Sequence, residues 1–339
     1  MKVCLVASRI KGMGGIEVTV RQLERGLIAR GFDVDVLTGI PIKIKGLMNP
    51  SFAIKALMLV NKVDADVFHA HDGFNMIPLS MAYGKKIMTI HGVWSKAMEF
   101  LHGKTIGWIA RGIESRYLKK VDALTVVSRE AERIYNEYHP IYIPNGIDVD
   151  EFGSKARNPV DLPDNSVLFI GRLSREKGVE VLLQAWRKVH NLIPSARLYI
   201  LGSGRLRRIV IDHEKLGVEF AGEVSHDEIP NWLCNASLFV LPSILETGMP
   251  MAVLEAMTMK VPVVATKCGG IPDVIIDGKT GILTEPNSID ALAEAIVRAL
   301  TSNLNQIIVN AYKYVRENHD LDECVNAYIK VYERILQSK

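Results

Sequence analysis

A loop that carries basic side chains follows one of the predicted strands. Arg172 and Lys177 both lie in the glycine-bounded segment 171–178, directly after an apolar run. Open parallel sheets bind their ligands beyond the carboxyl ends of the strands. A guanidinium and an ammonium there could bind a diphosphate, which carries about two negative charges. An ordinary solvated loop is the alternative, and the position at a strand end favours the anion site.

Two glutamates further along the chain could also take part in chemistry. Glu246 and Glu255 are nine residues apart, and a glycosidase would need its two carboxyl groups about 5–9.5 Å apart. Nine residues of continuous helix would separate them by about 13 Å, on opposite faces. Gly248 and Pro250 interrupt such a helix. We therefore predict Glu246 on a loop and Glu255 inside a helix that begins near Pro250.

The surroundings of Glu255 are apolar in sequence. A carboxylate there is costly to bury unless it is paired or accepts hydrogen bonds, for example from ribose hydroxyls. The backbone N–H groups of residues 248–251, at the start of the predicted helix, would face an anion.

A glycine-rich turn follows the first predicted strand. Gly12, Gly14 and Gly15 precede a helical stretch, and such a turn presents backbone N–H groups to an anion. A dinucleotide fingerprint fits poorly, because Glu17 stands in place of its third glycine and no acidic residue ends the second strand. A tight turn explains one glycine more easily than three. We expect a loop that faces a phosphate or a substrate.

Three histidines stand at the ends of predicted strands. The rings of His69 and His71 share one face of a strand, but the spacing supplies no third metal ligand. A polar wall or a structural role is favoured for this pair. His91 precedes Gly92 at another strand end, where a satisfied core histidine is the alternative to a functional one. No dedicated metal site is visible, and none is expected.

Short β-rich runs alternate with helical patterns along the chain, which is typical of parallel sheets covered on both faces. We predict an α/β protein with two doubly wound, Rossmann-like domains. The domains are predicted at residues 1–147 and 165–319, with a linker at 148–164 that is rich in glycine, proline and polar residues. A helix at 320–339 is long enough to cross back onto the first domain.

The composition is that of an ordinary globular protein. The 339 residues are 48% hydrophobic and 23% charged, with a net charge of +3, which argues against disorder and gives no field that would attract nucleic acid. Four widely spaced cysteines fit a reducing compartment. No apolar run approaches the roughly 20 residues of a membrane span, and the first residues form a strand pattern rather than a signal peptide. We expect a cytoplasmic protein.

Several short motifs occur along the chain in a fixed order. They are 171–178 (GRLSREKG), 201–204 (LGSG), 242–246 (PSILE), 254–257 (LEAM), 262–276, 278–283 (GKTGIL), and, in the first half, 14–17, 89–92 (TIHG), 127–128 and 143–148 (IPNGID). Taken in order, these motifs resemble the family-four retaining glycosyltransferases of the GT-B fold, the glycosyl transferases group 1. The likeness is strong in the second half, moderate in the first, and spans nearly the whole chain. In that fold the two domains face each other across a cleft.

The resemblance implies roles for individual side chains. His91, Glu246, Arg172 and Lys177 would be catalytic. The family usually has seven residues between its two glutamates and this chain has eight, so the extra residue falls near Thr247. The implied contacts are Arg172 and Lys177 with the donor diphosphate, Glu255 with the donor ribose, Glu246, Gly248, Met249 and Pro250 with the transferred sugar, Gly14 and Gly15 with donor and acceptor, and His91 with the reacting centre.

The resemblance also implies a reaction. A retaining transferase would move a sugar from a UDP- or GDP-sugar, held by the second domain, to a hydroxyl of a glycan, lipid or small-molecule acceptor held by the first. The leaving phosphate would accept the acceptor's proton, and neither a tightly bound cofactor nor a divalent metal would be required. The alternatives are a catalytically silent nucleotide-sugar-binding subunit and a nucleotide-sugar epimerase on the same fold. Turnover distinguishes an enzyme from a binder.

Two segments of the first half are basic and partly apolar. Residues 36–63 hold four lysines and no acidic residue, and residues 95–121 hold six basic and two acidic residues with interleaved large apolar side chains. Such segments could lie on an anionic membrane, although a solvated helix face is commoner. Peripheral contact with the inner face of a membrane is therefore a hypothesis. The lysines of the first segment are Lys43, Lys45, Lys55 and Lys62.

Overall fold

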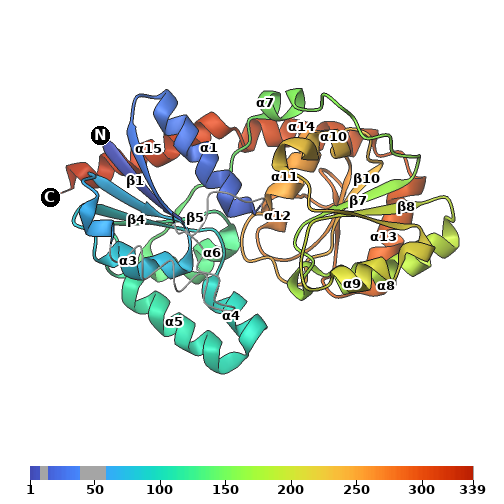
Figure 1. Cartoon of the computed structure of the whole chain (residues 1–339), viewed down its shortest axis with the longest axis horizontal. Coiled ribbons are helices and arrows are strands. Elements are labelled where there is room, and N and C mark those ends of the chain that lie inside the picture. Colours follow the sequence, from blue (N-terminus) through green and yellow to red (C-terminus); the bar gives the residue numbers. More distant parts are fainter. Residues whose placement is uncertain (8–13, 39–58, 339) are drawn as a thin grey trace. The chain divides into compact units, whose positions relative to one another are not determined.

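The computed structural model describes residues 1–7, 14–38 and 59–338, and it divides the chain into two compact units (Figure 1). The first unit comprises Met1–Gly146, Thr247–Met249 and Leu321–Lys339. The second comprises Ile147–Glu246 and Pro250–Asp320. Each unit is built around its own parallel sheet.

The sheet of the first unit has six parallel strands in the order β2-β1-β3-β4-β5-β6. The residues of β3 and β5 are all buried, because helices cover both faces. The strands are β1 (Lys2–Ala7), β2 (Asp33–Thr38), β3 (Val67–Ala70), β4 (Lys85–Ile90), β5 (Ala123–Val126) and β6 (Ile141–Tyr142).

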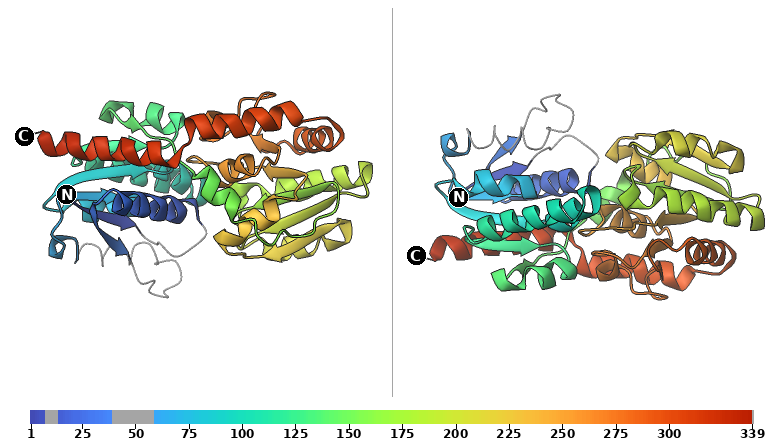
Figure 2. Two further views of the ribbon diagram at one scale, coloured as in Figure 1. Left: turned by 90° about the horizontal axis from the view of Figure 1, so that it is seen from above. Right: turned by 90° about the horizontal axis from the view of Figure 1, so that it is seen from below.

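The helices of the first unit form a layer on each face of this sheet. In Figure 1, α1 and α15 lie above the sheet and α3 and α5 below it, and the two views of Figure 2 show these faces in turn. The α-helices are α1 (Gly15–Ala29), α3 (Met76–Ser80), α4 (Trp94–His102), α5 (Lys104–Leu118), α6 (Arg129–Ile134) and α15 (Leu321–Gln337); short 3₁₀ turns are η1 (Val60–Lys62), η2 (Gly73–Asn75) and η3 (Asn136–Tyr138).

The predicted tail helix is α15, and it completes the core of the first unit. Its apolar residues repeat at three- and four-residue spacing, so Val325, Tyr328 and Tyr332 all point into one cluster with α1 and β1. Gly26 of α1 permits the close approach, because a Cβ there would lie 2.6 Å from the side chain of Val325. Helix α15 thus helps to bury one face of the first strand.

The second unit repeats the architecture with the strand order β12-β11-β10-β7-β8-β9. Its strands are β7 (Ser166–Ile170), β8 (Arg197–Leu201), β9 (Val218–Gly222), β10 (Leu238–Leu241), β11 (Val263–Thr266) and β12 (Ile282–Thr284). Its helices are α7 (Val149–Ser154), α8 (Val179–Leu192), α9 (Arg207–Ile211), α10 (Ile229–Leu233), α11 (Met251–Thr258), α12 (Ile271–Val274), α13 (Ile289–Thr301) and α14 (Asn305–Asn318), with η4 (Arg175–Lys177), η5 (Glu214–Leu216) and η6 (His226–Glu228).

The predicted fold class is confirmed, since both sheets are parallel and interleaved with helices. The interval 148–164, expected to be a linker, differs from that expectation. It contains α7, whose Asp148 caps the helix by accepting from the N–H of Glu151 at 2.8 Å, and α7 packs against α11 in the second unit. Within the described residues no helix is both long and apolar enough to span a bilayer.

Candidate functional site

The basic loop after β7 has a defined backbone. Gly178 has φ +69°, and a Cβ at this position would lie 1.9 Å from the carbonyl oxygen of Pro242. Only glycine therefore allows the loop to approach the segment after β10. The N–H groups of Ile244 and Leu245 both donate to the carbonyl of Glu176, at 2.8 and 3.1 Å. These bonds join the loops that follow two neighbouring strands.

Lys177 and Glu246 meet where these two loops join. The ammonium of Lys177 forms an ion pair with the carboxylate of Glu246, and the side chains are 16% and 12% exposed. The Glu246 carboxylate also accepts from the hydroxyl of Ser243 at 3.2 Å. Gly269 lets the loop after β11 pack on this segment, because a Cβ there would lie 1.6 Å from the carbonyl oxygen of Glu246. The pair is held at the carboxyl ends of β7 and β10, where sequence reasoning expected a ligand.

Arg172 has a different environment. Its side chain is 73% exposed and it pairs with Glu176 at 3.4 Å. Arg172 and Lys177 thus have separate carboxylate partners, and their convergence on one anion stays a prediction. An exposed arginine beside a fixed lysine can still swing to a bound anion, because its long side chain is not enclosed by the fold.

Glu255 lies inside α11, as predicted, while Glu246 lies on the preceding loop. Pro250 precedes the first helical residue with an extended backbone (φ −78°, ψ 117°). Glu255 is only 3% exposed, and its Oε1 lies 2.8 Å from Nε2 of His226. The hydrogen-bonding partner that a buried carboxylate needs is therefore a histidine.

His226 was not identified from the sequence. It begins η6, just after β9; a capping box holds this turn, and one ring contact joins it to α7. Ser225 and Glu228 form a capping box, with bonds of 2.9 and 2.6 Å to the Glu228 carboxylate. The ring of His226 lies 5.9 Å from that of Phe152 in α7. Its position in a loop after a predicted parallel strand is the feature of the sequence that could have identified it as a candidate.

The interval expected to be a linker therefore contributes to this arrangement. Phe152 of α7 packs beside His226, and Lys155, which follows the helix, pairs with Asp227 at 3.2 Å and with Glu151 at 2.9 Å. Since α7 also packs against α11, which carries Glu255, one short helix supports both partners of the His226–Glu255 contact.

The glycines at the start of α1 are only partly described. Gly14 is the N-cap residue, with φ −72° and ψ 150°, and its carbonyl accepts from the N–H of Val18 at 3.1 Å. A Cβ on Gly14 would lie 2.2 Å from a carboxylate oxygen of Glu17. Gly15 is the first residue of the helix. The preceding Gly12 lies outside the described residues, so the shape of this loop and its ligand remain predictions.

His91 and His71 are in contact at the ends of β4 and β3. Nε2 of His91 lies 3.0 Å from Nδ1 of His71. Burial lowers the pKa of His91 to about 4 and that of His71 well below its usual value, so both rings are neutral at pH 7. Nε2 of His71 is buried, and among the described residues it has no hydrogen-bond partner.

His69 has the structural role favoured above. Its Nδ1 lies 2.8 Å from the hydroxyl of Tyr332 in α15, and its Nε2 lies 2.6 Å from the hydroxyl of Thr89. Burial lowers the pKa of His69 to about 3. This fully buried histidine thus links the tail helix to the sheet. Across the part of the chain that the structure describes, no cluster of three or more His, Cys, Asp or Glu side chains is arranged to hold a metal ion.

Three residues between Glu246 and Pro250 belong to the first unit. Within that unit, the carbonyl of Thr247 accepts from the N–H of Val93 at 3.1 Å, and the carbonyl of Met249 accepts from the amide of Asn145 at 3.2 Å. A Cβ on Gly248 would lie 1.6 Å from the carbonyl oxygen of His91. The backbone of this segment thus has no space for a side chain at Gly248.

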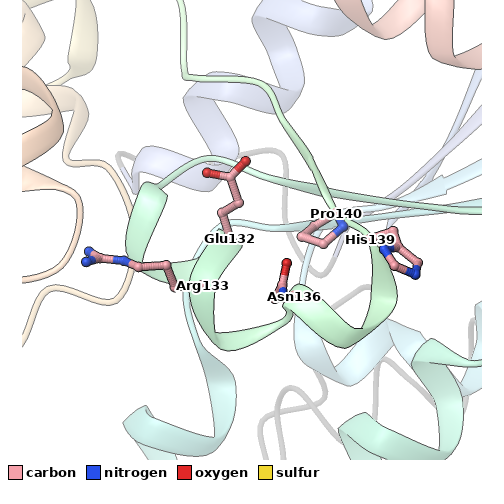
Figure 3. A pocket seen from close by; sticks show the side chains of 5 residues that line it. All are labelled: Glu132, Arg133, Asn136, His139 and Pro140. Atoms are coloured by element: carbon pink, nitrogen blue, oxygen red, sulfur yellow. The ribbon is translucent and has the colours of Figure 1, made fainter.

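One surface cavity lies away from all of these residues. It has a volume of about 600 Å³ and is formed by α6, η3 and the residues that follow, as Figure 3 shows. It is lined by Glu132, Arg133, Asn136, His139 and Pro140. Because none of the predicted site residues contributes to it, we assign it no part in the chemistry.

Two family models match the chain. Glycosyl transferases group 1 matches residues 164–302, and Glycosyltransferase Family 4 matches residues 13–151. The first match contains the Lys177–Glu246 and His226–Glu255 contacts, and the second contains Gly14, Gly15 and His91. Together the two matches cover most of both units.

Individual proteins of this kind are similar along much of the chain. A GDP-mannose-dependent monoacylated alpha-(1-6)-phosphatidylinositol monomannoside mannosyltransferase of Corynebacterium glutamicum is 29% identical over 64% of this chain and 64% of its own length. The structure of sucrose-phosphate synthase from Thermosynechococcus elongatus has a TM-score of 0.85 at 21% identity, over the full length of both chains. Anabaena HepE in complex with UDP-glucose has a TM-score of 0.75 at 18% identity, over 98% of this chain and all of its own.

Proposed function

The chain belongs to the glycosyltransferases of group 1 and family 4, and from that premise we propose that it transfers a sugar from a nucleotide-sugar donor to an acceptor hydroxyl with retention of configuration. The second unit binds the donor, and the first unit takes the acceptor. The observation that carries the proposal is the Lys177–Glu246 ion pair at the carboxyl ends of β7 and β10. It places a cation beside a carboxylate where a parallel sheet binds phosphate and sugar.

Arg172 and Lys177 bind the diphosphate of the donor. Before the donor binds, Glu246 balances the charge of Lys177 and holds its ammonium in place. Arg172 is largely exposed and closes onto the diphosphate when it arrives. As the bond between the sugar's anomeric carbon and the phosphate oxygen breaks, negative charge grows on the leaving diphosphate, and both cations stabilise it.

The carboxylate of Glu255 binds the ribose of the donor. Carboxylate oxygens accept hydrogen bonds from the two ribose hydroxyls, while His226 keeps one oxygen oriented. The turn that carries His226 therefore lies beside the nucleoside. UDP and GDP are both candidates, because HepE is described with UDP-glucose and the mannosyltransferase is named for GDP-mannose.

The transferred sugar lies near Glu246 and the residues that follow it, Gly248, Met249 and Pro250. The acceptor hydroxyl attacks the anomeric carbon on the face that the diphosphate leaves, and its proton passes to a departing phosphate oxygen. His91 takes part as a neutral hydrogen-bonding group, because burial lowers its pKa to about 4. Gly14 and Gly15 present backbone N–H groups at the start of α1 to donor or acceptor.

Binding of UDP, GDP and ADP, measured by calorimetry, tests the donor site. One nucleotide should bind saturably to the intact chain, and Lys177→Ala and Glu255→Ala should weaken it at least tenfold. Lys313→Ala removes a 70% exposed lysine of α14 in the same unit and serves as the matched control. If none of the nucleotides binds, or if both site variants bind like the control, the proposed donor site is wrong.

Turnover then tests the enzyme itself. Incubation with UDP-glucose or GDP-mannose should release the nucleoside diphosphate, and proton NMR of the product should show the same anomeric configuration as the donor. Binding without release of sugar, with any acceptor supplied, would instead identify a silent binding subunit. A donor sugar that returns with altered stereochemistry at another carbon would identify an epimerase.

A further inference from the structure

Helices α4 and α5 form a hairpin that projects from the first unit (Figure 1). Gly103 joins them with φ +91°, and Gly107 allows tight packing, because a Cβ there would lie 2.5 Å from the Cβ of Glu99. The base of the hairpin is fixed by Glu114, whose carboxylate accepts from the N–H of Ser95 at 3.1 Å and from the hydroxyl of Tyr135 at 2.7 Å. The hairpin is therefore an ordered element with a fixed outer surface.

Large apolar side chains are exposed on the outer part of this hairpin. Trp108 is 77% exposed, although tryptophan is usually much more buried. Three aliphatic neighbours are exposed as well: Leu101 at 50%, Ile106 at 41% and Ile109 at 46%. A shallow groove of about 480 Å³ runs along α5 beside Trp108 and Ile109. We call Leu101, Ile106, Trp108 and Ile109 the hairpin patch.

The charges around the hairpin patch are almost all positive. Residues 101–120 are all described, and their only acidic residue is the buried Glu114. Two exposed acidic residues lie nearby in sequence, Glu99 on α4 and Asp122 just after the segment, and Asp122 pairs with Lys85 at 3.7 Å. The exposed basic residues of this segment are Lys104, Arg111, Arg116, Lys119 and Lys120. Arg111 and Arg116 line the groove together with Trp108 and Ile109, so cations lie directly beside exposed apolar side chains.

We propose that the hairpin patch docks on the surface of an anionic phospholipid bilayer. Trp108 and the aliphatic side chains would enter the interface, and the basic residues would bind lipid phosphates. A second copy of this chain is a poorer partner, since a two-fold contact through the patch would bring its like charges together. This inference does not depend on which sugar is transferred.

The hypothesis from the sequence joined this segment to residues 36–63. Of the lysines in that earlier segment, Lys62 is described and exposed, whereas Lys43, Lys45 and Lys55 lie outside the described residues. The proposal therefore rests on the hairpin alone. The composition of the segment does not tell which of its side chains are exposed on the hairpin.

Flotation of the full chain with lipid vesicles tests the proposal. The protein should float with phosphatidylcholine vesicles that contain phosphatidylglycerol, and its recovery should fall with added salt. Vesicles of phosphatidylcholine alone should recover much less. Replacing Lys104, Arg116 and Lys119 together by serine should weaken binding about a hundredfold.

Substitutions in the hairpin patch distinguish the contribution of its apolar side chains to vesicle binding from that of the charged residues. Trp108→Ser with Ile109→Ser should reduce flotation at least tenfold, whereas Tyr83→Ser, which removes an 86% exposed aromatic from the same unit, should not. Trp108→Phe should still bind, but the blue shift of tryptophan fluorescence on vesicle addition should disappear. Thermal melts of each variant verify that the fold is kept.

Three outcomes would overturn the proposal. The first is equal recovery with neutral and anionic vesicles. The second is flotation of the patch variants at the level of the intact chain. The third is a dimer, seen by analytical centrifugation, that dissociates in the Trp108→Ser variant while the intact chain fails to float. That result would assign the hairpin patch to self-association.

Discussion

Removal of the His226 ring should cost both stability and nucleotide binding. Glu255 is 3% exposed, and the ring of His226 provides a hydrogen bond to its carboxylate at 2.8 Å. In His226→Ala the carboxylate loses this partner. A hydrogen bond to a charged group contributes about 1.5–3 kcal/mol.

The size of the effect follows from that range. For a domain of about 150–250 residues, each kcal/mol shifts the melting temperature by roughly 2–4 °C. His226→Ala should therefore lower the transition of the second unit by roughly 3–12 °C. That transition is identified as the one that a bound nucleoside diphosphate raises. The dissociation constant of the nucleotide should also rise about tenfold, because the ribose-binding carboxylate is no longer held in position.

Two control variants make the test selective. His226→Gln places an amide N–H near the position of Nε2 and should recover most of the stability and binding. His213→Ala removes a partly buried histidine of the same unit, with a 2.8 Å bond to the carbonyl of Ile209 but no buried carboxylate. If His226→Ala has the same melting temperature and nucleotide dissociation constant as His213→Ala, the contact with Glu255 does not contribute to stability or binding, and our reasoning is wrong. A lower melting temperature with unchanged nucleotide affinity would limit His226 to a structural role.

Three further predictions concern the loop, its glycine and the histidine core. Lys177→Met should raise the dissociation constant of the nucleoside diphosphate tenfold or more in calorimetry, since a charge-assisted contact is lost; an unchanged constant would remove Lys177 from the site. Gly178→Ala should destabilise in urea unfolding by more than the strain of about 1–3 kcal/mol, because its φ is +69° and a Cβ there would lie 1.9 Å from the carbonyl oxygen of Pro242. Gly153→Ala in α7 meets open space and should be neutral or stabilising. His69 is neutral when folded, with a pKa lowered to about 3, and takes up a proton near pH 6.5 when unfolded. Stability should therefore be full above pH 6.5 and decline as the pH falls towards 3, with a shallower decline in His69→Gln melts.

Several features followed from the sequence because they depend on neighbours along the chain. Continuous apolar strands that alternate with amphipathic helices predict parallel sheets, because such strands are buried on both faces and the helices cover them with their apolar sides. The interruption at Gly248 and Pro250 placed Glu246 on a loop and Glu255 in a helix, because neither residue continues a helix well. The loop of Lys177 was located for the same reason, as a glycine-bounded segment after a strand.

Other features were decided only when distant segments came together. Glu255 needed a partner, but that the partner is His226, 29 residues away, depends on how η6 and α11 pack. The interval 148–164 was predicted to be a linker because it is rich in glycine, proline and polar residues. Its short helix α7 is instead supported by packing on α11, a contact that the local sequence does not encode. Likewise His69 meets Tyr332 from the far end of the chain. Local patterns fix which residues can do chemistry, whereas the partner of each buried charge or ring is set by contacts that sequence spacing does not encode.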